Sequence, residues 1–153
     1  MKKQILSIVL VLAILVTGTV SYAAAKNSIK ELTPQEKVIK DFSAQFALTP
    51  TVSSTGKGFI ASSEVEGHQV SSAYTKRGNR VYTITRYPAD NLAKNIIDIV
   101  KGSYDKYYIT SMEKIEQPGF NAVYMVHLTN SNSIKTVRVS DNGLELLEDF
   151  KKS

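Results

Sequence analysis

Apolar residues recur in this sequence with two different periods, and the chain changes from one period to the other twice in the same order. Residues 33–48 show a helical period, and from about residue 58 the period becomes two, as along a strand with one buried face. The helical period returns after Pro88 and the strand period returns at Tyr107. This order of helix, strands, helix, strands predicts an α+β fold.

Sequence signals for helix ends support both helices. Thr33, Pro34 and Glu36 form a capping box with proline at the first helical position, and Thr49-Pro50 should end this helix. Asp90 is the expected N-cap of the second helix. The expected apolar stripes are Val38, Ile39, Phe42 and Phe46 on the first helix, and Leu92, Ile96, Ile99, Val100 and Tyr104 on the second.

The strand pattern predicts three or four strands after the first helix and four after the second. Phe120, Ala122, Tyr124, Val126 and Leu128 alternate along the clearest strand and should share its buried face. The whole order looks like two repeats of a helix plus an antiparallel meander, with the helices on one face of a curved sheet. The expected strands are 58–65, 69–75, 80–87, 107–115, 120–128, 134–139 and 144–149, and the residues expected to be buried include Phe42, Ile96, Val100, Tyr124 and Val126.

The N-terminus has the features of a secretory signal peptide. Lys2 and Lys3 precede an apolar run over residues 5–16, and small residues follow it. The apolar run is shorter than the roughly 20 residues that an uncleaved transmembrane anchor needs. We expect residues 1–23 to be the signal peptide, with cleavage after Ala25 as the alternative to cleavage after Ala23. Residues 24–32 would be a flexible lead-in to one domain over 33–153, which would be periplasmic or secreted and would keep no membrane span.

Composition excludes several classes of function. The chain has no cysteine, which rules out disulfides, thiolate metal sites, cysteine nucleophiles and a lipid anchor on cysteine. Removal of Lys2 and Lys3 lowers the net charge from +5 to about +3, which gives no strong attraction to nucleic acid.

No group of residues suggests catalysis. His68 lies in a turn and His127 in the middle of a strand, and neither has nearby partners for metal binding or general-base chemistry. Residues 141–143 (Asp-Asn-Gly) resemble part of a calcium loop without its other ligands, and a hairpin turn explains them. We therefore expect no catalytic residues, no metal, no cofactor and no enzyme activity.

Several segments resemble one known family: residues 104–109, 112–115, 124–128 and 137–143, together with the helix from Leu92 and residues 58–61. The layout is similar to that of PepSY-like, beta-lactamase-inhibitor-like small secreted bacterial proteins, which implies an exported α+β domain without catalytic residues. Two departures weaken the transfer of a binding surface: there is no tryptophan before the first hairpin, and Leu92-Ala93 stands where relatives often have leucine-proline.

Residues out of phase with the expected core define a candidate face for partner contact. Aromatic and arginine side chains on an exposed sheet are typical of binding hot spots, although ordinary cross-strand pairing would also explain them. We expect a binding or inhibitory module of the bacterial cell envelope, whose partner is an envelope protein or peptide. The alternatives are a small ligand-pocket protein or enzyme of cone-like α+β fold, and a passive structural envelope protein. The candidate contact residues are Tyr82, Arg86, Tyr108, Met125 and Arg138.

The signal-peptide assignment predicts the mature N-terminus. Intact-mass analysis of protein recovered from the cell envelope should find a chain that begins at Ala24 or Lys26, because small residues occupy the positions before both cuts. Retention of Met1 on a membrane-bound protein would contradict the assignment.

Overall fold

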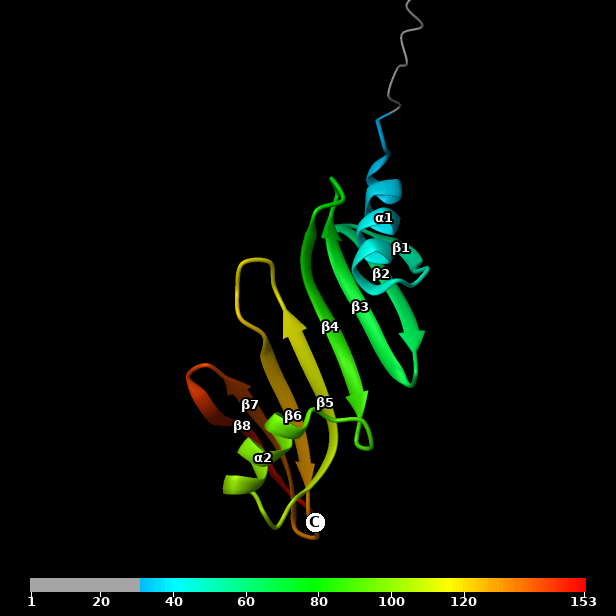
Figure 1. Ribbon diagram of the computed structural model, residues 1–153. Helices are drawn as coiled ribbons and strands as arrows, with labels where there is room; N and C mark the ends of the chain where they lie inside the picture. Colours follow the sequence, from blue (N-terminus) through cyan, green and yellow to red (C-terminus); the bar gives the residue numbers. More distant parts are fainter. Residues whose placement is uncertain (1–30) are drawn as a thin grey trace, which may run out of the picture. The chain divides into compact units, whose positions relative to one another are not determined.

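The computed structural model describes residues 31–153; the leader expected at 1–23 and residues 24–30 lie outside this part. The described chain forms helices and strands in an order close to the predicted one (Figure 1). In chain order these are α1 (Pro34–Phe46), β1 (Thr51–Thr55), β2 (Gly58–Val65), β3 (His68–Thr75), β4 (Arg80–Pro88), α2 (Lys94–Ser103), β5 (Tyr108–Glu116), β6 (Val123–Thr129), β7 (Ser133–Ser140) and β8 (Gly143–Lys151).

The strands form one open, antiparallel sheet in which each strand pairs with its neighbours in sequence. The spatial order of the eight strands is the same as their order along the chain, from β1 to β8. The sequence predicted three or four strands after the first helix, and the structure has four. The additional strand is β1, which directly follows α1. The α+β class is therefore confirmed, whereas the relation of the two halves as repeats stays a prediction.

Both helices cover the same face of this sheet. Helix α1 packs over Val70 of β3, and α2 packs over Met112 of β5. Val70 is opposite Thr85 and Met112 is opposite Tyr87, and these two residues of β4 are two positions apart. Side chains two positions apart on a strand point to the same face. Figure 1 shows the two helices over different parts of the sheet, which leaves the other face without a helix.

Helix α1 begins where the sequence predicts. The Thr33 backbone N–H donates to Glu36 Oε2 at 2.7 Å, and the Glu36 N–H donates to Thr33 Oγ1 at 3.3 Å, which completes the capping box. The helix ends at Phe46, before Thr49, because Ala47 adopts a left-handed conformation with φ of 54°. Ile39 was expected in the buried stripe but is 39% exposed.

Helix α2 begins later than predicted, and Asp90 is not its N-cap. The Asn91 N–H donates to the Pro88 carbonyl at 3.1 Å, so Asp90 lies inside a turn. The N-cap is Ala93, which makes no side-chain capping bond. Ile99 was also expected in the buried stripe and is 46% exposed, because the sheet-facing positions of this short helix are Ile96 and Val100.

The assignment of Phe120 to the buried face of a strand was wrong. Strand β6 begins only at Val123, and the Phe120 N–H donates to the Gln117 carbonyl at 3.1 Å in a turn that contains Gly119 at a φ of 82°. The Phe120 side chain is 75% exposed as a result. Of the other residues expected in the core, Phe42, Ile96, Val100 and Val126 are buried, whereas Tyr124 is only half-buried.

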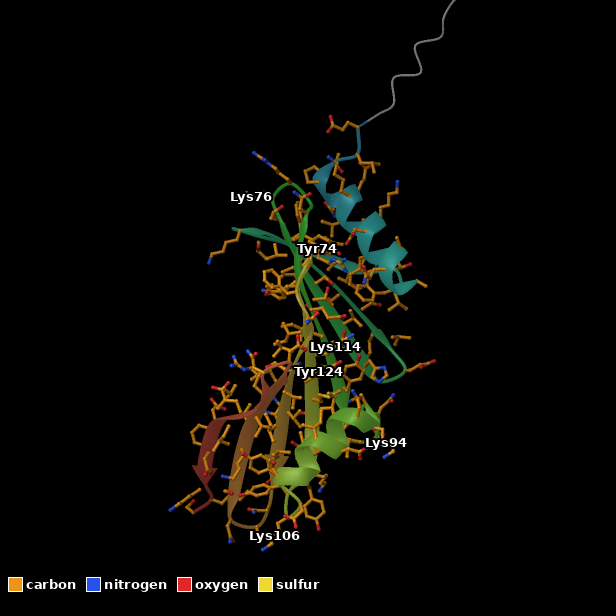
Figure 2. All side chains as sticks on the ribbon, turned by 60° about the vertical axis from the view of Figure 1, so that its left-hand side comes forward. Tyr74, Lys76, Lys94, Lys106, Lys114 and Tyr124 are labelled. Carbon is orange, nitrogen blue, oxygen red and sulfur yellow. The ribbon has the colours of Figure 1, made fainter. Side chains whose placement is uncertain are left out.

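The helix-covered face carries two separate hydrophobic cores with polar residues between them. One core joins Val38 and Phe42 of α1 to β2 and β3, and the other joins Ile96 and Val100 of α2 to β5, β6 and β7. Figure 2 labels Lys114 and Tyr124, which lie between the two helices along the sheet. We call the polar residues between the cores the polar seam, which consists of Ser72, Thr83, Thr85, Lys114 and Glu116.

Hydrogen bonds and an ion pair satisfy much of the polar seam. The hydroxyl groups of Ser72 and Thr83, both buried, are 2.7 Å apart. Lys114 Nζ lies 2.8 Å from Glu116 Oε1, and this hydrogen bond raises the pKa of Lys114 above its usual value. The two cores therefore meet through polar contacts and the backbone ladder.

The burial pattern of α1 predicts a large difference between two neighbouring substitutions. Phe42→Ala should lower the free energy of unfolding by about 3–5 kcal/mol, because Phe42 is fully buried and truncation leaves a cavity. Ile39→Ala on the same helix is the matched control and should cost about 1 kcal/mol or less. Urea denaturation of both variants measures the difference, and equal losses would show that α1 does not use this stripe.

Candidate functional site

The face without helices carries a row of mainly charged side chains that runs across six strands. In this row Gln69 of β3 is opposite Arg86 of β4, which is opposite Glu113 of β5. The row continues through Met125 of β6 and Arg138 of β7, and Glu145 of β8 follows it. We call this set the charged row: Gln69, Arg86, Glu113, Met125, Arg138 and Glu145.

The arginines of the charged row are held by neighbouring strands. Arg86 donates from Nε and Nη2 to Glu113 Oε1 at 3.0 and 2.6 Å, and from Nη1 to Gln69 Oε1 at 3.1 Å. Arg138 forms an ion pair with Glu145. The Arg86 and Arg138 side chains are 56% and 43% exposed, so a partner can reach both guanidinium groups while they stay fixed in position.

An apolar row lies beside the charged row on the same face. Ile84 of β4 is opposite Ile115 of β5, which is opposite Val123 of β6, and all three are half-buried. Tyr82 follows on the same face of β4, opposite Ala73. We call Tyr82, Ile84, Ile115 and Val123 the apolar row. A hydrophobic strip next to charged residues resembles the division of protein interfaces into an apolar centre and a polar rim.

The structure brings together four of the five residues that the sequence singled out. Arg86, Met125 and Arg138 belong to the charged row, and Tyr82 to the apolar row. Tyr108 stands apart at the start of β5, where it is 74% exposed and its ring lies 5.8 Å from Lys101 Nζ of α2.

Sequence reasoning missed the partners that fix these side chains. The sequence analysis assigns no role to Glu113 or Glu145 and does not place Ile115 or Val123 on this face. Residue type and the alternation of side chains along each strand could suggest these four residues. The strand register was needed to show that Glu113 lies between Arg86 and Met125.

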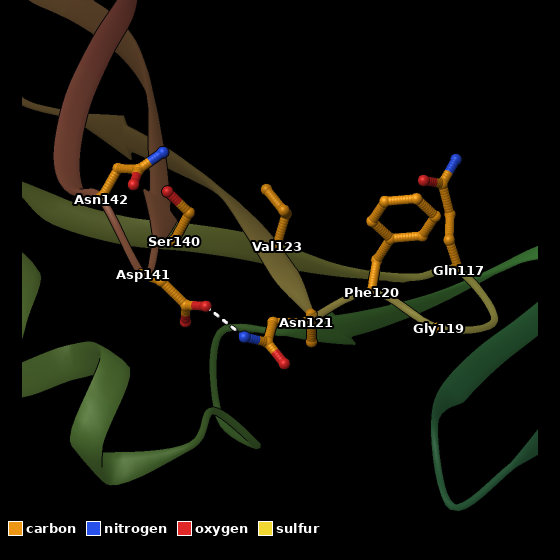
Figure 3. A pocket seen from close by; sticks show the side chains of 9 residues that line it. Gln117, Gly119, Phe120, Asn121, Val123, Ser140, Asp141 and Asn142 are labelled. Carbon is orange, nitrogen blue, oxygen red and sulfur yellow. Dashed lines mark hydrogen bonds between the residues drawn. The ribbon is translucent and has the colours of Figure 1, made fainter.

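Shallow pockets lie on and beside this face. One of about 280 Å³ lies among Ser62, Gln69, Ser71, Ile84 and Arg86. A second, of about 440 Å³, lies between the loop before β6 and the turn before β8, where Asn121 donates a hydrogen bond to Asp141 (Figure 3). The turn at residues 141–143 joins β7 to β8, as the hairpin interpretation predicted.

The histidines have structural surroundings. The His68 ring packs edge-on against Tyr87 with ring centroids 4.7 Å apart, and His127 Nδ1 lies 3.4 Å from Thr136 Oγ1. Within residues 31–153 no group of three or more His, Asp or Glu side chains could hold a metal ion. No helix in this part of the chain is both long and apolar enough to cross a membrane.

A second cluster of polar side chains lies on the helix-covered face, beneath α1. The buried Tyr74 hydroxyl donates to Asp41 Oδ2 of α1 at 2.9 Å, and Arg80 Nε lies 3.7 Å from the same oxygen. Burial, followed by the hydrogen bond to Asp41, raises the pKa of Tyr74 well above its usual value. Tyr74 is therefore a neutral hydrogen-bond donor that positions Asp41.

Comparison with solved structures identifies the class of fold. The chain is similar to a BLIP-like protein from Bacteroides fragilis, with a TM-score of 0.58 and 15% identity over 80% of this chain and 89% of that one. It is also similar to a DUF2874 family protein from Bacteroides ovatus, with a TM-score of 0.57 and 17% identity over 79% of this chain and 89% of that one. A candidate periplasmic protein from Bacteroides eggerthii has a TM-score of 0.56 and 10% identity over 75% of this chain and 86% of that one.

These similarities establish the fold and not the activity. No protein-family model and no curated protein matches the chain. The resemblance to beta-lactamase-inhibitor-like proteins is confirmed at the level of the fold by the BLIP-like neighbour, whereas its PepSY part stays a prediction.

Proposed function

We propose that this protein is an exported, non-enzymatic module that binds or inhibits a protein or peptide of the bacterial cell envelope through the helix-free face of its sheet. The observation that carries the proposal is the apolar row next to the charged row, on a face that no helix covers within residues 31–153. Its target is a polypeptide whose identity the surface does not specify.

The dimensions of the face favour a polypeptide as the ligand. Six strands span about 24 Å between the outermost two, and an eight-residue strand is about 26 Å long. A surface of this size approaches the roughly 800 Å² that one partner buries in a standard protein interface. The pocket of about 280 Å³ on this face is too shallow to enclose a drug-sized ligand, since it is open along the sheet.

The charges of the face favour a specific partner. Arg86 is already hydrogen-bonded to Glu113 and Gln69, so its guanidinium keeps one orientation in the free protein. Fixed side chains lose little conformational entropy on binding, which favours affinity. A partner with carboxylates spaced to meet Arg86 and Arg138 would complement the row, and the apolar row would supply hydrophobic burial.

The comparisons and the N-terminal sequence each support the proposal. A BLIP-like protein and a candidate periplasmic protein share the fold, which fits a non-enzymatic module outside the cytoplasm. The apolar run and small residues at the N-terminus support export through a signal peptide.

The proposal predicts that substitutions on this face weaken binding and preserve the fold. Immobilised protein would be used to capture envelope proteins, and the affinity of each captured partner would be measured for wild type, Tyr82→Ala and Arg86→Ala. Each substitution should weaken binding by about 30-fold, equivalent to the roughly 2 kcal/mol lost at a hot spot. Loss of the exposed Arg86–Glu113 pair should cost about 1 kcal/mol of stability or less.

Arg77→Ala is the matched control, because Arg77 lies exposed in the turn between β3 and β4, outside both rows. It should keep both the fold and the partner. A partner that binds Tyr82→Ala, Arg86→Ala and Arg77→Ala equally well would contradict the proposal. Unfolding of Tyr82→Ala would show that the apolar row is part of the core.

A further inference from the structure

The helix-covered face contains a polar pocket that the proposed binding face does not use. It lies between the end of α1 and the loop that joins β5 to β6, and its volume is about 180 Å³. Thr83 and Glu116, two of its lining residues, belong to the polar seam, so the pocket opens on the opposite side of the sheet from the charged row. The lining residues used below are Gln45, Arg80, Thr83, Glu116 and Phe120.

Arg80 is the positively charged residue of this pocket, and Asp41 of α1 holds it in place. Asp41 Oδ2 accepts the Tyr74 hydroxyl at 2.9 Å and lies 3.7 Å from Arg80 Nε. Arg80 is also directly opposite Tyr74, at a β-bulge between β3 and β4. These contacts fix the Nε side of the guanidinium without using its hydrogen-bonding capacity.

The Arg80 guanidinium therefore keeps its donors free. Within residues 31–153 it forms the ion pair with Asp41 and donates no hydrogen bond, and its Nε is buried without a hydrogen-bond partner. Because Nε faces Asp41, the Nη1 and Nη2 groups, which make no hydrogen bond in this part of the chain, are the donors available to a ligand oxygen. The Gln45 side chain, which also lines the pocket, makes no side-chain hydrogen bond in the described part of the chain and can donate from its amide.

We propose that this pocket binds the carboxylate of a small organic acid. The planar fork of a guanidinium matches a carboxylate with two parallel hydrogen bonds. Lys114 holds Glu116 at 2.8 Å and offsets its negative charge. Phe120, 75% exposed at the same pocket, offers an apolar surface to the carbon atoms next to the carboxylate.

The surrounding charges favour a carboxylate over a phosphate. The pocket has one arginine, and Asp41 and Glu116 lie near it. A phosphate carries about 1.5 to 2 negative charges at neutral pH, so it would meet stronger repulsion from these acids than a singly charged carboxylate would.

The test is an NMR titration of isotope-labelled protein, expressed with its leader and purified from the periplasm. The probes are N-acetylalanine, its uncharged amide and inorganic phosphate, each at millimolar concentrations. N-Acetylalanine should shift the backbone amides of Gln45, Thr83 and residues 116–122 in a saturable way. The amide should not, and phosphate should bind more weakly than N-acetylalanine.

Substitutions identify the group responsible. Arg80→Gln should abolish the saturable shifts. Arg80→Lys should weaken binding about tenfold, because a lysine lacks the planar fork of a guanidinium. The control Arg77→Gln should leave binding unchanged. If Arg80→Gln fails to fold, Arg80→Lys and Gln45→Ala carry the test, and both should weaken binding.

Three results would overturn the proposal. The first is equal shifts with N-acetylalanine and its amide, which would show that the charge is not recognised. The second is tighter binding of phosphate than of N-acetylalanine. The third is the absence of saturable shifts in the wild-type protein, or their persistence at wild-type strength in Arg80→Lys.

Discussion

The pairing of β4 with β5 is the interaction on which the rest of the structure depends. It runs from the Thr83–Glu116 pair to the Pro88–Ser111 pair and joins a half that packs against α1 to a half that packs against α2. The two hydrophobic cores do not merge across it, because polar residues occupy the helix-covered face there. The join therefore relies on the backbone ladder, on polar pairs such as Arg86–Glu113 and on the hydrophobic pairs Ile84–Ile115 and Tyr87–Met112, without a core shared by the two helices.

This way of joining the halves gives the two faces of the sheet different properties. On the helix-free face the strand register aligns side chains from both halves into one charged row and one apolar row, so the proposed binding surface extends across the join. On the helix-covered face the gap between the cores leaves the polar pocket around Arg80, with polar walls and a fixed cation. Both proposed sites thus follow from one feature, the meeting of two small cores through a polar seam.

The sequence predicted the class of fold, both helices and most of the strands, because periodicity and capping signals are local. It placed the start of α2 and the side chain of Phe120 wrongly, since turns at residues 88–91 and 117–120 interrupt patterns that look continuous in sequence. The alternation of side chains along each strand also identified Arg86, Met125 and Arg138 as residues of one face. It could not reveal Glu113 between them or the Tyr74–Asp41–Arg80 cluster, because these depend on register and on contacts between distant elements.

Amide hydrogen exchange across the join between β4 and β5 tests the central claim most directly, because the continuous binding face exists only while this ladder is closed. If the sheet is one cooperative unit, the amides between β4 and β5 exchange as slowly as those of β3 and β6, through global unfolding. Exchange of the β4–β5 amides much faster than that of both neighbouring strands would mean that the halves separate on their own, and would contradict a single continuous face.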